Sequence, residues 1–302
     1  MSRYIIITPA HNEEAFIART AESIIAQTVR PFRWIVVNDA STDRTGQIVG
    51  QYASRHGFIQ LLNVERPAGR HFGNKVRAFN LGLTEARKEA FDFIGNLDAD
   101  ISFEANYFER ILREFGNNPK LGLAGGLVCT RVGAAFVSQK VALDSVAGAV
   151  QLFRRECFDQ VGGYIPLPNG GIDAAAEVSA RMHGWETRTF PEYRVLEHRL
   201  TGSARARPLG SRLNEGRRMY SLGYSYHFFI VRCVYRTFES PWVLGSLAAL
   251  FGYFDSLYRG RPVMVPPEVV HFLRGEQNQK LKRLLRLPVW LKGADAAPLC
   301  TR

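Results

Sequence analysis

The sequence predicts an α/β fold in which helices flank a mostly parallel sheet, followed by a helical, basic C-terminal region. Short β-rich runs alternate with segments of helical spacing through the first two thirds of the chain, which is typical of βαβ units. Residues 199–302 show no strand pattern. They carry 17 Lys and Arg against 6 Asp and Glu, whereas residues 1–198 carry 22 of each.

Length and charge together predict two domains. The chain has 302 residues, which fits one large or two small domains. We place the boundary between residues 198 and 199, because the whole net charge of +11 belongs to the second part. A hydrophobic content of 46% excludes a disordered chain. Four cysteines without a close pair exclude a disulfide scaffold, and we expect buried thiols.

The elements of the first domain can be predicted in order along the chain. Residues 5–7, all isoleucine, precede a proline and polar residues, as a buried strand before a loop would. Val76, Phe79 and Leu83 have helical spacing. The predicted elements are strands at 5–7, 34–37, 59–64 and 91–97 and helices at 15–26, 45–54, 75–89 and 104–115.

Polar residues follow three of these strands, over residues 8–14, over residues 38–43, and at Asp98 and Asp100. In open α/β sheets, ligands bind outside the carboxyl ends of the strands. We therefore expect the chemistry at one edge of the first domain. The turn after the first strand has no Gly-x-Gly-x-x-Gly, which argues against a dinucleotide cofactor.

Asp98-Ala99-Asp100 allows two interpretations. Two carboxylates one residue apart can hold a hard cation such as Mg²⁺ or Mn²⁺, which also binds diphosphate oxygens. Alternatively, the segment is a solvated loop in which Asp98 or Ser102 caps the following helix. Residues 38–43 are similarly open to interpretation as a capping turn, but Asp39 has no structural need to be acidic there.

Taken together, four motifs resemble the family 2 glycosyltransferases of the GT-A (Rossmann-like) fold. They are Thr8-Pro9-Ala10-His11-Asn12-Glu13-Glu14, Val37-Asn38-Asp39-Ala40-Ser41-Thr42-Asp43, Gly73-Asn74-Lys75 with Asn80-Leu81-Gly82, and Asp98-Ala99-Asp100. The resemblance covers residues 4–198. Within the family, the chain is similar in particular to bacterial members that assemble exopolysaccharide. It implies a nucleotide-diphosphate sugar donor, commonly with uridine, a divalent Mg²⁺ or Mn²⁺, and inversion at the anomeric carbon.

The resemblance also implies roles for single residues. The expected nucleotide-binding residues are Thr8, Pro9, His11, Glu13, Asp39, Lys75 and Asp98. Asp98 would contact ribose or metal, and Asp100 would be the principal metal ligand. His11 replaces the usual Tyr of the family, and Asn38 a frequent Asp. His198 stands where several relatives place a residue against the metal or the diphosphate; its alternative role is structural.

The resemblance places the catalytic base at Asp173, eleven residues before Gly184-Trp185. The Glu that usually precedes it is Ile172 here. Asp173 could also be the N-cap of a helix over 174–183, which would keep it ionised. Glu177, one helical turn later, is a secondary candidate.

The basic region is predicted to contain helices over residues 216–236, 242–258 and 268–287. The second is apolar nearly all round, so it either packs on the first domain or lies in an anionic membrane surface. The longest uncharged stretch, 15 residues, is shorter than the ~20 of a spanning helix. The N-terminus has no signal-type apolar segment, so we expect a cytoplasmic protein. The resemblance to exopolysaccharide-assembling members implies a peripheral position at the inner face of the plasma membrane.

These observations favour a glycosyltransferase that uses a saccharide or lipid-linked acceptor. A sugar nucleotidyltransferase would carry a Gly-rich basic loop after the first strand, where residues 9–13 read Pro-Ala-His-Asn-Glu. A non-enzymatic basic protein that binds membrane or nucleic acid is the remaining alternative. No nucleic-acid-binding module is recognisable, and we expect no nucleic-acid partner.

Overall fold

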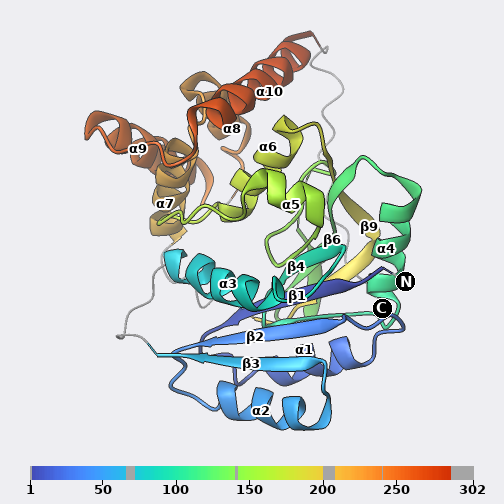
Figure 1. The fold of residues 1–302 in the computed structure, drawn as a ribbon. Coiled ribbons are helices and arrows are strands. Elements are labelled where there is room, and N and C mark those ends of the chain that lie inside the picture. Colours follow the sequence, from blue (N-terminus) through green and yellow to red (C-terminus); the bar gives the residue numbers. More distant parts are fainter. Residues whose placement is uncertain (1, 66–71, 140–141, 200–207, 240, 287–302) are drawn as a thin grey trace. The chain divides into compact units, whose positions relative to one another are not determined.

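The computed structural model describes residues 2–65, 72–139, 142–199, 208–239 and 241–286 (Figure 1). Within these ranges the chain forms two compact units. The first comprises the described residues up to 166 together with 172–199, and the second comprises 167–171 and the described residues from 208 onward. Each unit is described by itself below.

One half of the sheet in the first unit is parallel (Figure 1). The order β3-β2-β1-β4 joins β3 (Ile59–Val64), β2 (Arg33–Asp39), β1 (Tyr4–Ala10) and β4 (Phe93–Leu97). They are connected by α1 (Ile17–Ile25), α2 (Thr45–Arg55) and α3 (Phe72–Ala86). The predicted alternation of strands and helices is therefore confirmed. Because β1 is in register with β2 and β4, the carboxyl ends of these strands meet at one edge.

The other half of the sheet mixes both pairing directions. Antiparallel pairing joins β8 (Val150–Arg154) to β4 and to β6 (Leu121–Val132), and parallel pairing joins β6 to β9 (Glu186–Glu197). Two short strands, β5 (Ile101–Phe103) on β9 and β7 (Ala135–Ser138) on β6, complete it. The helices here are α4 (Tyr107–Asn117), α5 (Arg155–Val161) and α6 (Ile172–Met182).

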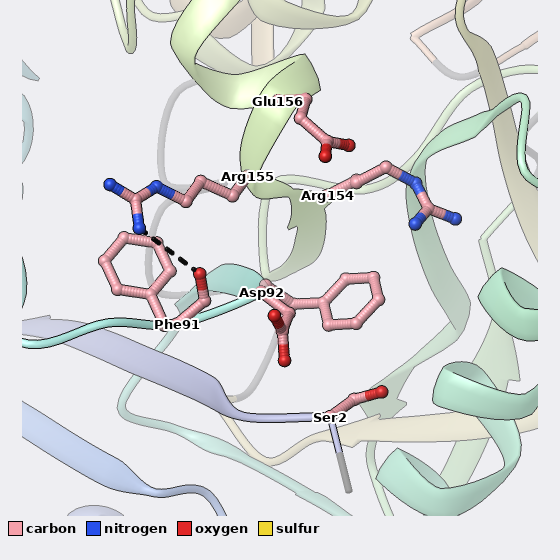
Figure 2. A pocket seen from close by; sticks show the side chains of 7 residues that line it. Ser2, Phe91, Asp92, Arg154, Arg155 and Glu156 are labelled. Carbon is pink, nitrogen blue, oxygen red and sulfur yellow. Dashed lines mark hydrogen bonds between the residues drawn. The ribbon is translucent and has the colours of Figure 1, made fainter.

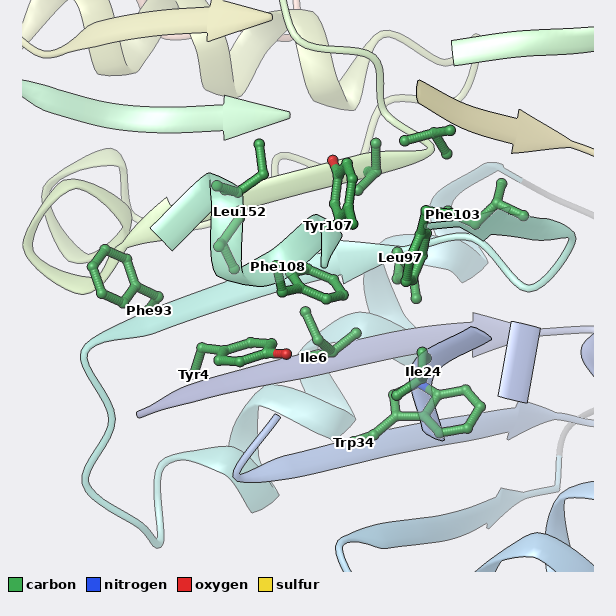
Figure 3. Close-up of a cluster of buried hydrophobic side chains, with 14 of the residues drawn as sticks. Tyr4, Ile6, Ile24, Trp34, Phe93, Leu97, Phe103, Tyr107, Phe108 and Leu152 are labelled. Atoms are coloured by element: carbon green, nitrogen blue, oxygen red, sulfur yellow. The ribbon is translucent and has the colours of Figure 1, made fainter. Parts of the chain in front are cut away.

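The apolar residues of β1 alternate between two cores. Tyr4 and Ile6 belong to the core that Trp34 and Phe108 share, which Figure 3 shows. Ile5 and Ile7 belong to a second core on the opposite face, together with Phe79 of α3. Since side chains alternate along a strand, a strand buried on both faces needs a continuous apolar run. This explains why residues 5–7 are all isoleucine.

The second unit is helical, with α7 (Pro208–Ser221), α8 (Tyr226–Tyr235), α9 (Trp242–Tyr258) and α10 (Pro267–Arg286). The predicted single helix over 216–236 is wrong. Gly223 interrupts it with a φ of +78°, and a Cβ there would lie 2.6 Å from Val270. The predicted helix over 242–258 is confirmed, and the helix predicted over 268–287 ends at Arg286, since 287 lies outside the described residues.

Two further observations complete the description. Among the described residues, none of the helices is long and apolar enough to cross a membrane. Cys157 and Cys233 are buried free thiols, as expected. Cys129 is disulfide-bonded, so the expectation of a thiol is wrong there, and Cys300 lies outside the described residues.

Candidate functional site

The loops that leave β1 and β2 are tied to each other by hydrogen bonds. The backbone N–H of Thr42 donates to Asn12 Oδ1 at 2.8 Å, and the N–H of Asn12 donates to Ser41 Oγ at 3.0 Å. Asn12 and Ala40 have positive φ values of 55° and 50°. Non-glycine residues in this region are strained, and such strain persists where the surroundings fix the backbone. The two loops therefore form one rigid rim at the carboxyl edge of the sheet.

His11 and Asp39 lie together on this rim. His11 Nδ1 lies 2.6 Å from the carbonyl oxygen of Asp39, so this nitrogen carries the proton and donates it. Asp39 is buried at the tip of β2. Thr8 is different, because its hydroxyl is buried and accepts a hydrogen bond from Trp34 Nε1 at 2.9 Å. The structure thus turns the Thr8 side chain into the core, while half-buried Pro9 follows it on β1.

The Asp98–Asp100 segment is held in place by backbone contacts. The N–H of Asp98 donates to the carbonyl of Ala149 at 2.9 Å. The Thr20 hydroxyl lies 2.8 Å from the carbonyl oxygens of both Ala99 and Ile101. Asp100 is buried. The N-cap position of α4 is Asn106, so neither Asp98 nor Ser102 caps that helix. The alternative of a solvated capping loop is therefore wrong.

Two basic side chains form ion pairs with the carboxylates of Asp98 and Asp100. Lys75 Nζ lies 2.5 Å from Asp98 Oδ1, and Arg199 Nε lies 2.9 Å from Asp100 Oδ2. Arg199 also forms an ion pair with Glu13. Burial, the largest single influence, would lower the pKa of Lys75. The charge and hydrogen bond of Asp98 and the charges of Asp173 and Asp100 together outweigh it, so the pKa is raised. Burial, and then the charge of Asp98, raise the pKa of Asp100 in spite of Arg199.

His198 supports this segment through its backbone. Its N–H donates to the carbonyl of Asp100 at 2.8 Å. In its ring, Nδ1 lies 3.4 Å from a guanidinium nitrogen of Arg19 and Nε2 lies 2.7 Å from Ser102 Oγ. Burial, followed by the charges of Arg19 and Arg131, lowers the pKa of His198, which favours the neutral ring. The ring thus faces Ser102 and Arg19, whereas the main chain touches Asp100.

Asp173 lies in the first turn of α6, which begins at Ile172, so it is not the N-cap. A Cβ at Gly148 would lie 2.8 Å from Asp173 Oδ2, so the glycine leaves room for this carboxylate. The charge of Asp173 contributes to the raised pKa of Lys75 and to that of Glu177. Asp173 is therefore part of the same electrostatic cluster as Asp98 and Lys75.

Glu177 and Tyr164 are the most deeply buried polar groups of this cluster. Glu177 accepts a hydrogen bond from the N–H of Val146 at 2.9 Å, and burial, with the charge of Asp173, raises its pKa to about 8. The Tyr164 hydroxyl donates to Gln151 Oε1 at 2.7 Å. Burial raises the pKa of Tyr164, and the charge of Asp173 adds to this.

Arg199 is the site residue that the motifs did not identify. It follows β9, and its partners Glu13 and Asp100 lie 186 and 99 residues away in the sequence. The one sequence signal was a basic residue next to His198, shortly after the strand-like run Arg194-Val195-Leu196. Such a signal indicates a position at a strand end, but it does not identify the partner.

The carboxylates fit a hard divalent cation. Among the described residues, no group of three or more His, Cys, Asp and Glu side chains could hold a metal by itself. Mg²⁺ is usually bound through one or two carboxylates plus substrate phosphates rather than by a cage of protein ligands. Asp98 and Asp100 are two carboxylates of this kind at the end of a strand. The pKa of Asp100 is raised first by burial and then by the negative charge of Asp98, which a cation would offset.

A pocket of about 570 Å³ lies elsewhere, at the amino end of β4 (Figure 2). Phe91, Asp92 and Arg155 line it, and Arg155 donates to the carbonyl of Phe91. The neighbouring Arg154 donates to the carbonyl of Phe115 at 2.9 Å. This pocket shares none of its residues with the Asp98–Asp173 cluster.

A family model described as glycosyl transferase family 2 matches residues 5–171, more than half of the chain. The uncharacterized glycosyltransferase EpsJ of Bacillus subtilis is 32% identical over 37% of this chain and 30% of its own length. The poly-beta-1,6-N-acetyl-D-glucosamine synthase of Staphylococcus epidermidis is 24% identical over 50% of this chain and 39% of its own. The chain thus spans well under half the length of these relatives.

Solved structures show the same fold. A mannosyltransferase of Pyrobaculum calidifontis, in complex with GDP-Man and Mn²⁺, matches with a TM-score of 0.55 and 19% identity over 94% of this chain and 82% of its own. S. aureus TarS (residues 1–349), in complex with UDP-GlcNAc, matches with a TM-score of 0.57 and 12% identity over 93% and 92%. The predicted GT-A fold is therefore confirmed.

Proposed function

The chain belongs to glycosyl transferase family 2, and we propose that it transfers a sugar from a nucleotide-diphosphate donor to an acceptor hydroxyl with inversion. The observation that carries this proposal is the cluster of Asp98, Asp100 and Asp173 around Lys75 at the carboxyl edge of the sheet. Acidic groups for a cation and for a proton thereby meet where α/β sheets bind ligands. The GDP-Man and UDP-GlcNAc in the two related structures support the donor class, and we propose UDP as its nucleotide.

The rim formed by the first two loops would bind the nucleoside. His11 and Asp39 are already joined there, and the carboxylate of Asp39 can accept N–H or O–H groups of a base or ribose. Thr8 and Pro9 would contribute backbone rather than hydroxyl contacts, because the Thr8 hydroxyl is bonded to Trp34. Glu13 would hold Arg199 in position.

Asp100, with Asp98, would hold Mg²⁺ or Mn²⁺ on the donor diphosphate. When bound, the cation neutralises the charge that develops on the departing diphosphate. Lys75 and Arg199, which are paired with these carboxylates, would balance their negative charge before the cation binds. His198 is a third candidate ligand; to bind a cation, its ring would have to give up its contact with Ser102 at Nε2 or with Arg19 at Nδ1.

Asp173 would act as the general base. Its carboxylate would take the proton of the acceptor hydroxyl, whose oxygen forms the new bond to the anomeric carbon while the bond from that carbon to the diphosphate oxygen breaks. Asp173 lies in the first turn of α6, where the helix dipole interacts favourably with an acidic side chain.

A saccharide or a lipid-linked sugar is the acceptor class that we propose, with a role in polysaccharide or glycolipid assembly. The similarity to a poly-beta-1,6-N-acetyl-D-glucosamine synthase supports this class. We further propose that the protein works in the cytoplasm, at the inner face of the plasma membrane.

The experiment is a melting-temperature screen of nucleotide sugars with and without Mn²⁺, followed by donor turnover with the donor that shifts the protein. Asp173→Asn should keep the Mn²⁺-dependent shift and lose about 10²-fold or more in turnover. Asp100→Ala should lose the shift itself. The matched control is Glu156→Gln, which changes the first-turn acid of α5 and should leave both values unchanged.

Near-full turnover by both Asp173→Asn and Asp100→Ala would show that the proposed mechanism is wrong. Synthesis of a nucleotide sugar from a nucleoside triphosphate and a sugar phosphate would instead identify a sugar nucleotidyltransferase.

A further inference from the structure

Helix α9 buries small side chains and exposes large apolar ones. Its buried residues are mostly small, among them Gly245, Ala249, Gly252 and Ser256. Its large residues are exposed, including Leu244, Leu247, Phe251 and Phe254. A helix on the surface of a soluble domain normally buries its large apolar stripe and presents polar residues to water. α9 does the reverse.

The packing of α7 against α9 explains the small residues. A Cβ at Gly252 would lie 2.1 Å from the carbonyl oxygen of Leu213, and a Cβ at Gly216 would lie 1.9 Å from that of Ala249. The two helices therefore approach so closely that only glycine fits at these positions. Among the described residues of the second unit, the large apolar side chains of α9 remain exposed beside this contact.

Helix α8 adds a second exposed apolar row. Phe229 is buried against Tyr253 of α9, with their ring centroids 5.0 Å apart. Ile230, Val234 and Phe238 are exposed. Of the 21 large hydrophobic side chains that are exposed in the described residues, 14 lie between Tyr226 and Tyr258. Single exposed apolar residues are normal, but a concentration of this size marks an interaction site.

Arginines flank these rows in excess over their acidic partners. Asp255 is paired with Arg259 at 2.5 Å and with Arg217 and Arg261 at 3.8 Å each. Near the end of α8, Arg232 and Arg236, together with Arg212 of α7, share the two acids Glu215 and Glu239. Six arginines thus face three carboxylates, and each cluster keeps a net positive charge. A partner that complements these rows and arginines has an anionic surface and an apolar interior.

We propose that the exposed side of α8 and α9, here called the apolar face (Tyr226–Tyr258), docks on the surface of an anionic phospholipid bilayer. Its large side chains would enter the interface between headgroups and acyl chains, and Trp242, Tyr235 and Tyr258 suit the headgroup level. The arginine excess would attract acidic lipids, each basic side chain adding to the affinity. The proposal is independent of the transfer reaction.

The test is flotation of the full chain with vesicles of phosphatidylcholine, with and without 30% phosphatidylglycerol. Binding to the anionic vesicles should be at least tenfold tighter at 0.05 M than at 0.5 M salt, because salt screens the headgroup attraction. The double variant Leu247→Gln with Phe251→Gln should bind at least tenfold more weakly at low salt. Arg259→Gln with Arg261→Gln should weaken binding to anionic vesicles only.

The matched control is Val132→Gln with Leu209→Gln, which changes two exposed apolar residues outside the apolar face. This variant should bind like the unchanged protein. Equal binding by the control and by Leu247→Gln/Phe251→Gln would overturn the proposal. So would a dimer in the absence of vesicles that the same double variant converts to monomer, since a second copy would then cover the face. Because all four positions are exposed, misfolding is not expected, and unchanged melting temperatures check this.

Discussion

At the scale of single residues, buried charge is concentrated where the sheet ends. Asp100 and Glu177 are carboxylates with little exposure, and each lies next to a second carboxylate. An arrangement of this kind is costly to fold, and shifted pKa values cluster at functional sites, where they serve proton transfer. Lys75 and Arg199 compensate part of this cost through their ion pairs.

Glu177 should make folding stability dependent on pH. Its pKa in the folded protein is about 8, above the ordinary value of 4.5, so the folded state holds a proton that the unfolded state has lost. Its contribution is therefore fully present below about pH 4.5 and is lost as the pH rises toward 8, by at most about 1.4 kcal/mol per pH unit. Glu177→Gln keeps the acceptor for Val146 but cannot ionise. The melting temperature of this variant relative to the unchanged protein should rise between pH 5 and 8. Parallel curves would contradict this assignment.

Arg199 should stabilise Asp100 in the absence of a bound cation. Arg199→Ala leaves a buried carboxylate without its partner, which costs about 1–3 kcal/mol for a charged hydrogen-bonded group, less the screening at this partly exposed arginine. We expect a lower melting temperature that Mn²⁺ with UDP restores in part. The control is Arg44→Ala, because the Arg44 side chain is 76% exposed and its pair with Glu14 lies at the surface. A loss of equal size in both variants would count against the role of Arg199.

At the scale of elements, the sequence pattern predicted those helices and strands whose burial leaves a continuous apolar run. The apolar runs of β1 to β4 and the span of α9 could be read from the sequence, because burial on both faces or all-round apolarity leaves a continuous signal. The break at Gly223 could not, because a glycine inside a helical pattern is often tolerated and this one turns against Val270, 47 residues later.

The candidate site was predictable to the same extent. The motifs predicted which strand ends carry acids, and the structure brings Asp98, Lys75 and Asp173 together there. The orientation of Thr8 toward Trp34 and the pairing of Arg199 with Asp100 depend on tertiary packing between distant segments. No pattern along the chain contains that information, which is why Arg199 was missed.

Substitution of glycine by alanine should change the stability in opposite directions at the α7–α9 contact and in α10. Gly252→Ala places a Cβ 2.1 Å from a backbone oxygen, so the helices must separate and the melting temperature should fall by several degrees. In α10, Gly275→Ala meets nothing within 4 Å and should stabilise by up to about 1 kcal/mol, because alanine favours helices. Circular dichroism melting of both variants measures the difference. Stabilisation by both would show that the close contact does not restrict position 252.

At the scale of the whole molecule, the charge of +11 has a definite location. Residues 1–198 are neutral and contain the proposed donor site, whereas the excess lies in residues 199–302, which contain the apolar face. The proposed chemistry and the proposed attachment therefore lie in different parts of the chain. Each task should therefore be removable without the other, although the two units are parts of one chain.

This separation predicts that one variant loses only donor binding and another loses only vesicle binding. A ligand at 100 times its dissociation constant stabilises the folded state by about 2.7 kcal/mol, so saturating UDP with Mn²⁺ should raise the melting temperature. Asp100→Ala should abolish that rise and still float with anionic vesicles as the unchanged protein does. Leu247→Gln with Phe251→Gln should lose flotation and keep the full rise. If either variant lost both properties while remaining folded, donor binding and membrane docking would be coupled, and the charge asymmetry would not mark two independent tasks.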